Sequence, residues 1–214
     1  MRKFLTATLF LVIFTFSLCG CFKKIDYTDY VSESRTTIYI YCDDEISVKI
    51  YCGNKESPYC ADGIKGKVES FTEILVKFLN NPKSVNITCD NICGEMNYNA
   101  VKNAFYLSDG VKIPPLDDLL FKLEVDGKAY EYKATNVTLN GVISKETALN
   151  CVIEYDGETF EQLTEHGLFN GEIFIRILYD EGCYYYVGVC DTQGKIKAYL
   201  LDGVYGKIIA ERNL

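Results

Sequence analysis

The chain has 214 residues, and its 30 acidic side chains outnumber its 22 basic ones, which gives a formal net charge of −8. This length allows one large domain or two small ones. An acidic chain without a basic run disfavours nucleic acid as a partner, because contacts to phosphates need Lys and Arg. We therefore expect a folded protein with no nucleic-acid partner and, in the absence of a recognisable binding motif, no cofactor.

The first 20 residues have the pattern of an export signal. Arg2 and Lys3 precede an uncharged run over residues 4–18. This run is shorter than the about 20 apolar residues that a membrane-spanning helix needs, and its length suits the apolar region of a signal peptide. The sequence thus predicts a signal peptide over residues 1–20, with a retained membrane anchor as an alternative.

The signal ends in Leu18-Cys19-Gly20-Cys21, which resembles the lipobox of bacterial lipoproteins. In that motif an aliphatic residue, a tolerated middle residue and Gly or Ala precede the modified cysteine. The resemblance implies cleavage after Gly20, a lipid on Cys21 and a position on the extracytoplasmic face of the cell membrane. Cys19 fits that role poorly, because Leu18 precedes it. The polar residues 21–35 are expected to form a tether.

The next segment, residues 36–140, is expected to form an α+β module. Runs of β-branched and tyrosine residues on both sides of Asp43-Asp44-Glu45 predict a hairpin. Residues 67–80 place apolar side chains at helical spacing, so we expect a helix there. Two short strands are expected on either side of a loop over residues 90–99, and Asp126-Gly127 predicts a second hairpin.

The remaining residues, 141–214, are expected to form a second α+β module. Ser144 is a suitable N-cap for one helix, and residues 158–167 suggest another that ends at Gly167. Four strand-like runs joined by glycine-containing turns then predict an antiparallel meander. For the whole chain this gives an α+β fold of antiparallel sheets with packed helices.

Residues 144–211 resemble a divergent PepSY domain. The matching stretches are "ISKETALNCVIEY" and "KIKAYLLDGVYGKIIAE", in which Tyr199, Asp202 and Gly206 fall on the tyrosine, turn aspartate and turn glycine of the family. Three positions depart from the family pattern, namely Leu201, Gly203 and Tyr205. The resemblance implies a non-catalytic extracytoplasmic module that binds a partner protein or restrains a peptidase. Independently of it, Asp202 is suited to accept hydrogen bonds from turn amides and Gly206 to adopt a positive φ.

Besides Cys19 and Cys21, eight cysteines are candidates for disulfides or reactive thiols. They are Cys42, Cys52, Cys60, Cys89, Cys93, Cys151, Cys183 and Cys190. An export signal makes disulfides possible, but eight cysteines allow 105 pairings and the sequence selects none. Cys89 and Cys93 lie close together in the sequence, so a redox or metal site built on them is an alternative function.

His166 is the single histidine of the chain. It is expected at the C-terminal end of a helix, where a cation is favoured by the helix dipole. A hydrolase site centred on His166 remains an alternative, because catalytic triads are assembled in space rather than in sequence. The leading hypothesis is a non-catalytic membrane-anchored lipoprotein that binds a protein or peptide of the cell envelope.

Overall fold

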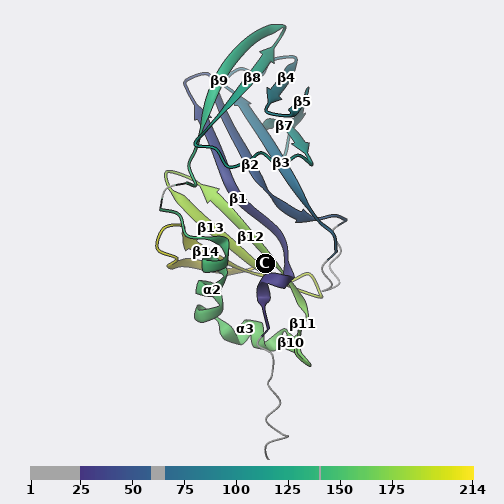
Figure 1. Cartoon of the computed structure of the whole chain (residues 1–214), viewed down its shortest axis with the longest axis vertical. Coiled ribbons are helices and arrows are strands. Elements are labelled where there is room, and N and C mark those ends of the chain that lie inside the picture. The colour runs from purple at the N-terminus through teal and green to yellow at the C-terminus, as the bar shows by residue number, and fades with distance from the viewer. Residues whose placement is uncertain (1–24, 59–65, 140) are drawn as a thin grey trace, which may run out of the picture.

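The computed structural model describes residues 25–58, 66–139 and 141–214. Strands account for 57% of these residues and helices for 12%, so the expected α+β class is wrong and the fold is mostly β. Thirteen of the described strands form one strongly curved sheet, and a two-stranded hairpin stands apart from it. Figure 1 shows that both α-helices lie at one end of an elongated molecule.

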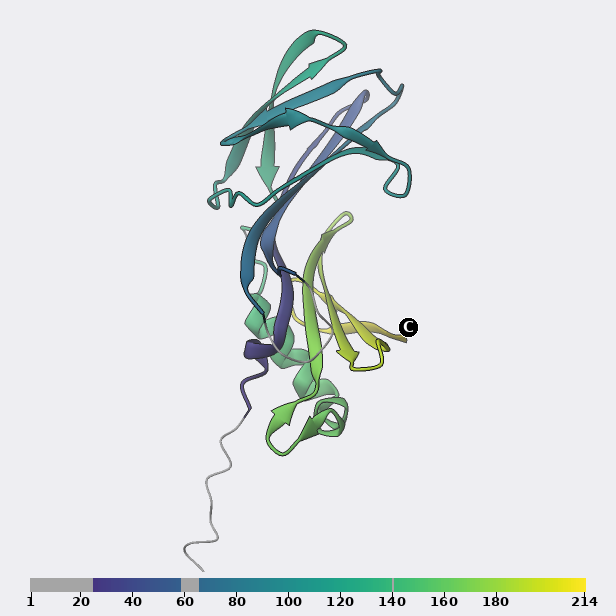
Figure 2. The ribbon, with the colours of Figure 1, turned by 90° about the vertical axis from the view of Figure 1, so that its right-hand side faces the viewer.

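Three long neighbouring strands run along the middle of the molecule: β1 (Val31–Cys42), β2 (Ile46–Glu56) and β3 (Val68–Phe78). Figure 2 shows how they curve between its two ends. The hairpin expected at Asp43-Asp44-Glu45 joins β1 to β2. There the Asp43 carboxylate accepts hydrogen bonds from the backbone N–H groups of Glu45 and Ile46, each at 2.8 Å, which closes the turn.

Residues 68–78 form β3 rather than the expected helix. The strand pairs with β2 on one side and with β7 on the other. This strand carries apolar side chains on both faces, with Ile74 and Val76 in the first core and Phe71 and Leu75 on the other side, and this can imitate helical spacing. Val68, Ile74 and Val76 are β-branched and favour the extended conformation.

Six further strands complete the upper part of the molecule in Figure 1. They are β4 (Val85–Cys89), β5 (Ile92–Glu95), β6 (Asn97–Asn99), β7 (Ala104–Asp109), β8 (Asp118–Val125) and β9 (Lys128–Asn136). The hairpin expected at Asp126-Gly127 joins β8 to β9, and both turn residues have positive φ. The expected loop over residues 90–99 instead contains β5 and β6. Together with β1–β3, these strands enclose the first hydrophobic core.

The C-terminal part begins with two short helices. They are α2 (Lys145–Tyr155) and α3 (Gly157–Gln162), followed by the hairpin of β10 (Thr164–Glu165) and β11 (Leu168–Phe169). Ser144 caps α2 as expected, because its hydroxyl accepts a hydrogen bond from the backbone N–H of Thr147 at 3.1 Å. Ala148, Leu149 and Val152 of α2 are fully buried in a second hydrophobic core.

The antiparallel meander expected after the helices is confirmed. Its strands are β12 (Gly171–Tyr179), β13 (Cys183–Asp191), β14 (Ile196–Asp202) and β15 (Ile208–Asn213), and each pairs with the next. A parallel pairing of β12 with β1 joins the meander to the N-terminal strands in one sheet. Because β1 begins at Val31, after a 3₁₀ turn over Tyr27–Tyr30, residues 31–35 belong to this sheet rather than to a tether.

Candidate functional site

One face of the central strands is left uncovered by the first core. In β2, the half-buried Ser47, Lys49 and Tyr51 alternate with the buried Val48 and Ile50. Successive strand residues point to opposite sides, so the first three side chains share the face away from that core. The register of β2 with β3 brings Glu73, Leu75 and Lys77 to the same face.

A pocket of about 460 Å³ lies on this face and is here called the basic pocket. Its lining residues are Arg35, Ser47, Lys49, Tyr51, Leu75, Lys77 and Lys102. Four of the seven are cations and none is an anion, although acidic residues outnumber basic ones in the chain. The lining of the basic pocket is therefore positively charged, whereas the chain as a whole has a negative net charge.

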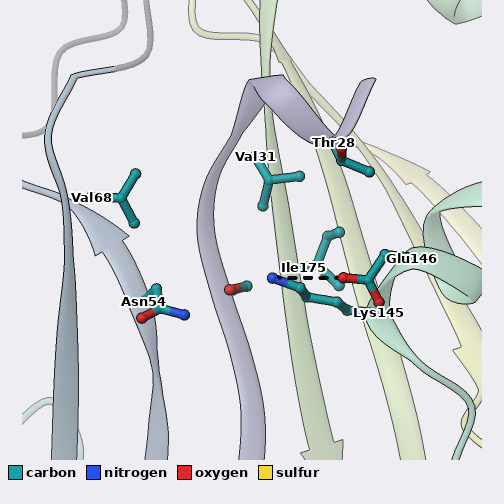
Figure 3. A pocket seen from close by; sticks show the side chains of 8 residues that line it. Thr28, Val31, Asn54, Val68, Lys145, Glu146 and Ile175 are labelled. Atoms are coloured by element: carbon teal, nitrogen blue, oxygen red, sulfur yellow. Dashed lines mark ion pairs between the residues drawn. The ribbon is translucent and has the colours of Figure 1, made fainter. Parts of the chain in front are cut away.

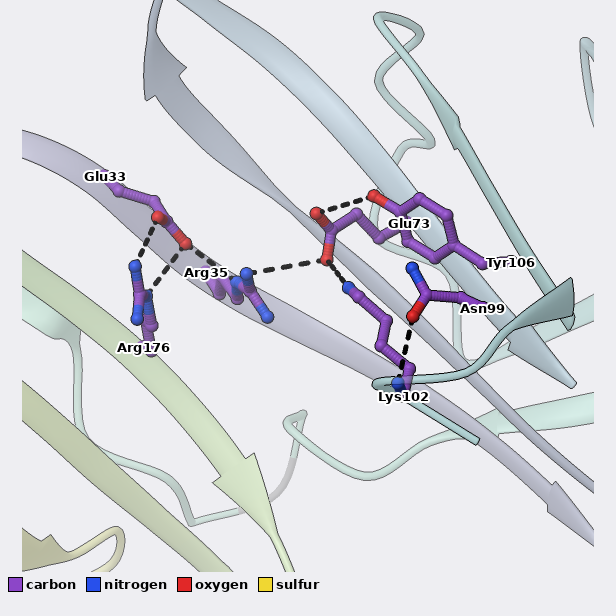
Figure 4. Close-up of polar contacts among 7 residues, drawn as sticks. All are labelled: Glu33, Arg35, Glu73, Asn99, Lys102, Tyr106 and Arg176. Carbon is purple, nitrogen blue, oxygen red and sulfur yellow. Dashed lines mark hydrogen bonds and ion pairs between the residues drawn. The ribbon is translucent and has the colours of Figure 1, made fainter. Parts of the chain in front are cut away.

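Arg35 is held in place by a carboxylate that it shares with a second arginine (Figure 4). The Nε of Arg35 donates to Glu33 Oε1 at 2.8 Å. Arg176 of β12 donates to both oxygens of Glu33, at 2.9 and 2.7 Å. Burial opposes ionisation of Glu33, but the hydrogen bonds and charges of Arg176 and Arg35 outweigh it and hold the pKa of this carboxyl below its usual value.

A second carboxylate, Glu73, lies beside the pocket with an exposure of 7%. Its Oε1 accepts a hydrogen bond from the Tyr106 hydroxyl at 3.1 Å. Its Oε2 is 3.5 Å from Arg35 Nη2 and 3.6 Å from Lys102 Nζ, and within the described ranges no hydrogen bond reaches this oxygen. Arg35 and Lys102 are thus attracted electrostatically to Glu73, but their N–H groups do not hydrogen-bond to its Oε2 and can donate to another acceptor.

Lys102 comes from the turn between β6 and β7 rather than from the sheet face. The side chain of Asn99 accepts a hydrogen bond from the Lys102 backbone N–H at 3.0 Å, which fixes this turn. The Lys102 Nζ stands 4.2 Å from the centre of the Tyr106 ring, within the range of a cation–π contact. Figure 4 shows Lys102 pointing from its turn towards Glu73.

The other two cations are less constrained. Lys49 Nζ makes a long contact of 3.4 Å with the Tyr179 carbonyl, and Lys77 forms no ion pair with any described residue. Both side chains extend from central strands, whose positions are fixed by hydrogen bonds on both sides. The arrangement is suited to attract an anion to a rigid surface.

A second hollow lies near α2 and is smaller (Figure 3). It has a volume of about 100 Å³ and is lined by Thr28, Val31, Ser34, Asn54, Val68, Lys145, Glu146 and Ile175. The one cation among these residues, Lys145, lies 3.9 Å from its neighbour Glu146. This hollow offers less room and a charge that is already balanced, so the basic pocket is the better candidate site.

The described cysteines do not pair. Cys42 and Cys93 are exposed, the others are buried or half-buried, and all seven are free thiols; Cys21 and Cys60 lie outside the described residues. In the β4–β5 hairpin, Cys89 opposes Ile92 and Cys93 opposes Thr88, so the two thiols lie on opposite faces. Burial raises the pKa of Cys89 to about 12. The geometry therefore does not support a shared redox or metal site of Cys89 and Cys93.

His166 lies in the turn between β10 and β11, not at the end of a helix. It has a φ of 51°, and the next residue, Gly167, has a φ of 81°. The side chain is 90% exposed, and its Nε2 is 3.6 Å from Glu165 Oε1. No hydroxyl or thiol of the described chain is hydrogen-bonded to it. The structure thus does not assemble a hydrolase site around His166.

The turn between β14 and β15 has the structure that its residue types indicate. Asp202 Oδ1 accepts hydrogen bonds from the backbone N–H groups of Val204 and Tyr205, at 2.9 and 2.7 Å. Gly206 has a φ of 68° and donates its N–H to the Asp202 carbonyl at 3.0 Å. Both residues therefore have a structural role in this turn.

Comparison with known proteins adds no relative: no family model matches the chain, and no similar curated protein or solved structure is found. Of the residues that the structure describes, none belongs to a helix long and apolar enough to cross a membrane. The signal peptide that the sequence predicts for residues 1–20 lies outside the described residues.

Proposed function

We propose that the chain is an extracytoplasmic lipoprotein, attached to the cell membrane through Cys21, that binds a protein or peptide of the cell envelope without catalysing a reaction. The attachment is supported by the Leu18-Cys19-Gly20-Cys21 motif. The binding role rests on one observation, the basic pocket on the central strands. The PepSY resemblance of residues 144–211 favours the same kind of role.

The pocket is built in a way that favours binding. Arg35 is fixed by Glu33, and Lys102 is fixed through the turn that Asn99 closes. Groups that are already ordered lose little conformational entropy when a partner arrives, so more of the contact energy appears as affinity. Tyr51 and Leu75 add half-buried apolar surface between the charges, as is usual for protein-binding surfaces.

The position of the pocket also suits a membrane-attached protein. The described chain begins beside α3, where the ring of Tyr27 lies 4.9 Å from that of Phe160. In Figure 1 this is the lower end of the molecule. Arg35, at one end of the pocket, follows Val31 by four residues, or about 13 Å of strand. A lipid on Cys21 would therefore leave the pocket open to partners beyond the membrane surface.

Photo-crosslinking in intact cells tests this function. A photoreactive residue replaces Ser47 inside the pocket in the full chain, and a matched one replaces Lys128, the exposed first residue of β9. We expect a covalent adduct with an envelope polypeptide from position 47 only, and its loss when Lys49 and Lys77 are both changed to Glu. Equal adducts from both positions, or none from position 47, would contradict the proposed function.

A further inference from the structure

The cations of the basic pocket follow the direction of the strands. On one face of a strand, side chains recur every second residue, about 7 Å apart. The strand register orders the cross-strand pairs along this face as follows: Ser47 with Lys77, Lys49 with Leu75, Tyr51 with Glu73, and Gly53 with Arg35. The first and last pairs are six residues apart along β2, or about 20 Å.

The charges along this row are not balanced by the protein. Glu33 offsets Arg176, with which it makes two hydrogen bonds. Glu73 offsets one charge between Arg35 and Lys102. Lys49 and Lys77 have no ion-pair partner among the described residues. An anion with several charges in a row would complete this arrangement.

The surface between the cations is not purely polar. Leu75 and Tyr51 are half-buried, and the Arg35 guanidinium lies 5.6 Å from the centre of the Tyr51 ring and 5.9 Å from that of Phe71. A polyphosphate chain has no apolar groups to place on such a surface. A peptide has both carboxylates and apolar atoms, so it matches the row better.

We infer that the basic pocket binds an acidic segment of a protein in an extended conformation, with carboxylates on alternate residues facing Lys77, Lys49 and the Arg35–Lys102 pair. This inference rests on the proposed function and names the chemistry of its ligand. Alternate side chains of an extended segment are about 7 Å apart, which is the spacing of the pairs along the sheet. Lys77 and Lys49 belong to the first two pairs, and Arg35 and Lys102 both reach Glu73 in the third. About six residues span the row.

In this arrangement the charge of Glu73 should weaken the binding of an acidic ligand. Its Oε2 stands between Arg35 and Lys102 without a hydrogen bond from a described residue. A ligand carboxylate that approaches these cations is repelled by Glu73 and competes with it. Removal of this charge should therefore strengthen binding, whereas removal of a pocket lysine should weaken it. A purely structural role of Glu73 would not produce opposite signs.

The test uses the full chain purified in detergent and fluorescently labelled hexapeptides. One peptide has Glu at alternate positions, and its counterpart has Gln there. We expect the Glu peptide to bind at least tenfold more tightly at low salt, with the difference shrinking as salt screens the charges. Lys77→Gln and Lys49→Gln should each weaken binding about fivefold, and Glu73→Gln should strengthen it severalfold. Lys128→Gln, outside the pocket, should change it less than twofold.

Different failures have different meanings. If both peptides bind equally and the pocket variants weaken both, the proposed function stands and the acidic ligand is wrong. If inorganic polyphosphate binds with the same lysine dependence and neither peptide does, the inference of a peptide ligand is overturned. If nothing binds and the adduct at position 47 is also absent, the proposed function fails as well. A Glu73→Gln variant that binds the Glu peptide more weakly would overturn the role given to Glu73.

Discussion

Glu33 is the residue on which the ion network of the central strands depends. Two guanidinium groups share its carboxylate, whose side chain is 15% exposed. Glu33→Gln removes the carboxylate that Arg35 and Arg176 share, and the loss of one partner from a largely buried ion network is costly. We expect the free energy of unfolding to fall by about 3 kcal/mol at pH 7, measured by urea denaturation.

The same variant tests the titration of Glu33. The pKa of this carboxyl is lowered in the folded protein, so its stabilising effect is present above the pKa of the unfolded chain and is lost as pH falls through the folded-state pKa. The difference between wild type and Glu33→Gln should therefore shrink in acid. Glu131→Gln, which removes the carboxylate of an exposed pair with Lys122, is the control and should change stability little. A difference that stays constant down to pH 2 would contradict the prediction.

Gly206 offers a second test at the scale of one residue. A Cβ at this position would lie 2.7 Å from Cys151 Sγ and 3.3 Å from Ile143 Cδ1, and the φ of 68° disfavours any branched side chain. Gly194 in the preceding turn has a φ of 82° with open space around it. We expect Gly194→Val to cost about 1 kcal/mol from backbone strain alone.

Gly206→Val adds the contact with Cys151 to the same strain. Thermal melts should therefore show a larger fall in midpoint for Gly206→Val than for Gly194→Val, with a cost of roughly 2 kcal/mol. Equal falls would mean that α2 moves freely away from the turn, and an unchanged midpoint would mean that residue 206 leaves the left-handed region.

At the scale of elements, the sequence predicts those whose ends have distinctive turn chemistry. The hairpins at Asp43-Asp44-Glu45 and Asp126-Gly127 form because Asp and Gly adopt or close tight turns there. The start of α2 follows from Ser144, which caps it. The meander after residue 170 is predictable for the same reason, since each joint contains a glycine.

Elements that depend on long-range pairing are less predictable. The apolar residues of β3 fit both a helix and a strand with apolar side chains on both faces, and pairing with β2 and β7 decides between them. The short β5 and β6 have no strong local pattern and exist because β4 and β7 offer partners. The turn at His166-Gly167 is also hard to predict from the sequence, because the residues before it favour a helix.

The basic pocket is predictable only in part, because some of its residues follow from local sequence patterns and others depend on long-range pairing. Lys49 and Lys77 each stand among apolar residues in strands, a pattern that places them on the opposite face once β3 is recognised as a strand. Arg35 lies in a segment expected to be a tether, and Lys102 reaches the pocket from a turn that is distant in sequence. The sequence could therefore suggest two of the four cations, but not that all four meet.

At the scale of the whole molecule, a single strand, β1, connects the N-terminal strands with the C-terminal meander. β1 pairs with β2, with β9 and, in parallel, with β12, so the N-terminal strands and the C-terminal meander share one sheet. Composition and periodicity describe segments and do not reveal such a joint. This is why the sequence predicts an α+β class for a fold that is mostly β and whose α-helices lie only at the C-terminal end.

The proposed attachment of the whole molecule to a membrane depends on residue 21. We expect Cys21 to carry a diacylglyceryl group, because only this cysteine follows a small residue, Gly20, with Leu18 in the aliphatic position. Two acyl chains hold a protein on a bilayer where one is marginal, since each buried methylene contributes about 0.8 kcal/mol. Cys21→Ser should leave an unprocessed precursor, whereas the matched variant Cys19→Ser should be processed normally. Detergent partitioning and mass spectrometry of the mature N-terminus measure both results. Recovery of unmodified Cys21, or failure of the Cys19 variant alone, would contradict the lipid attachment while leaving the basic pocket untouched.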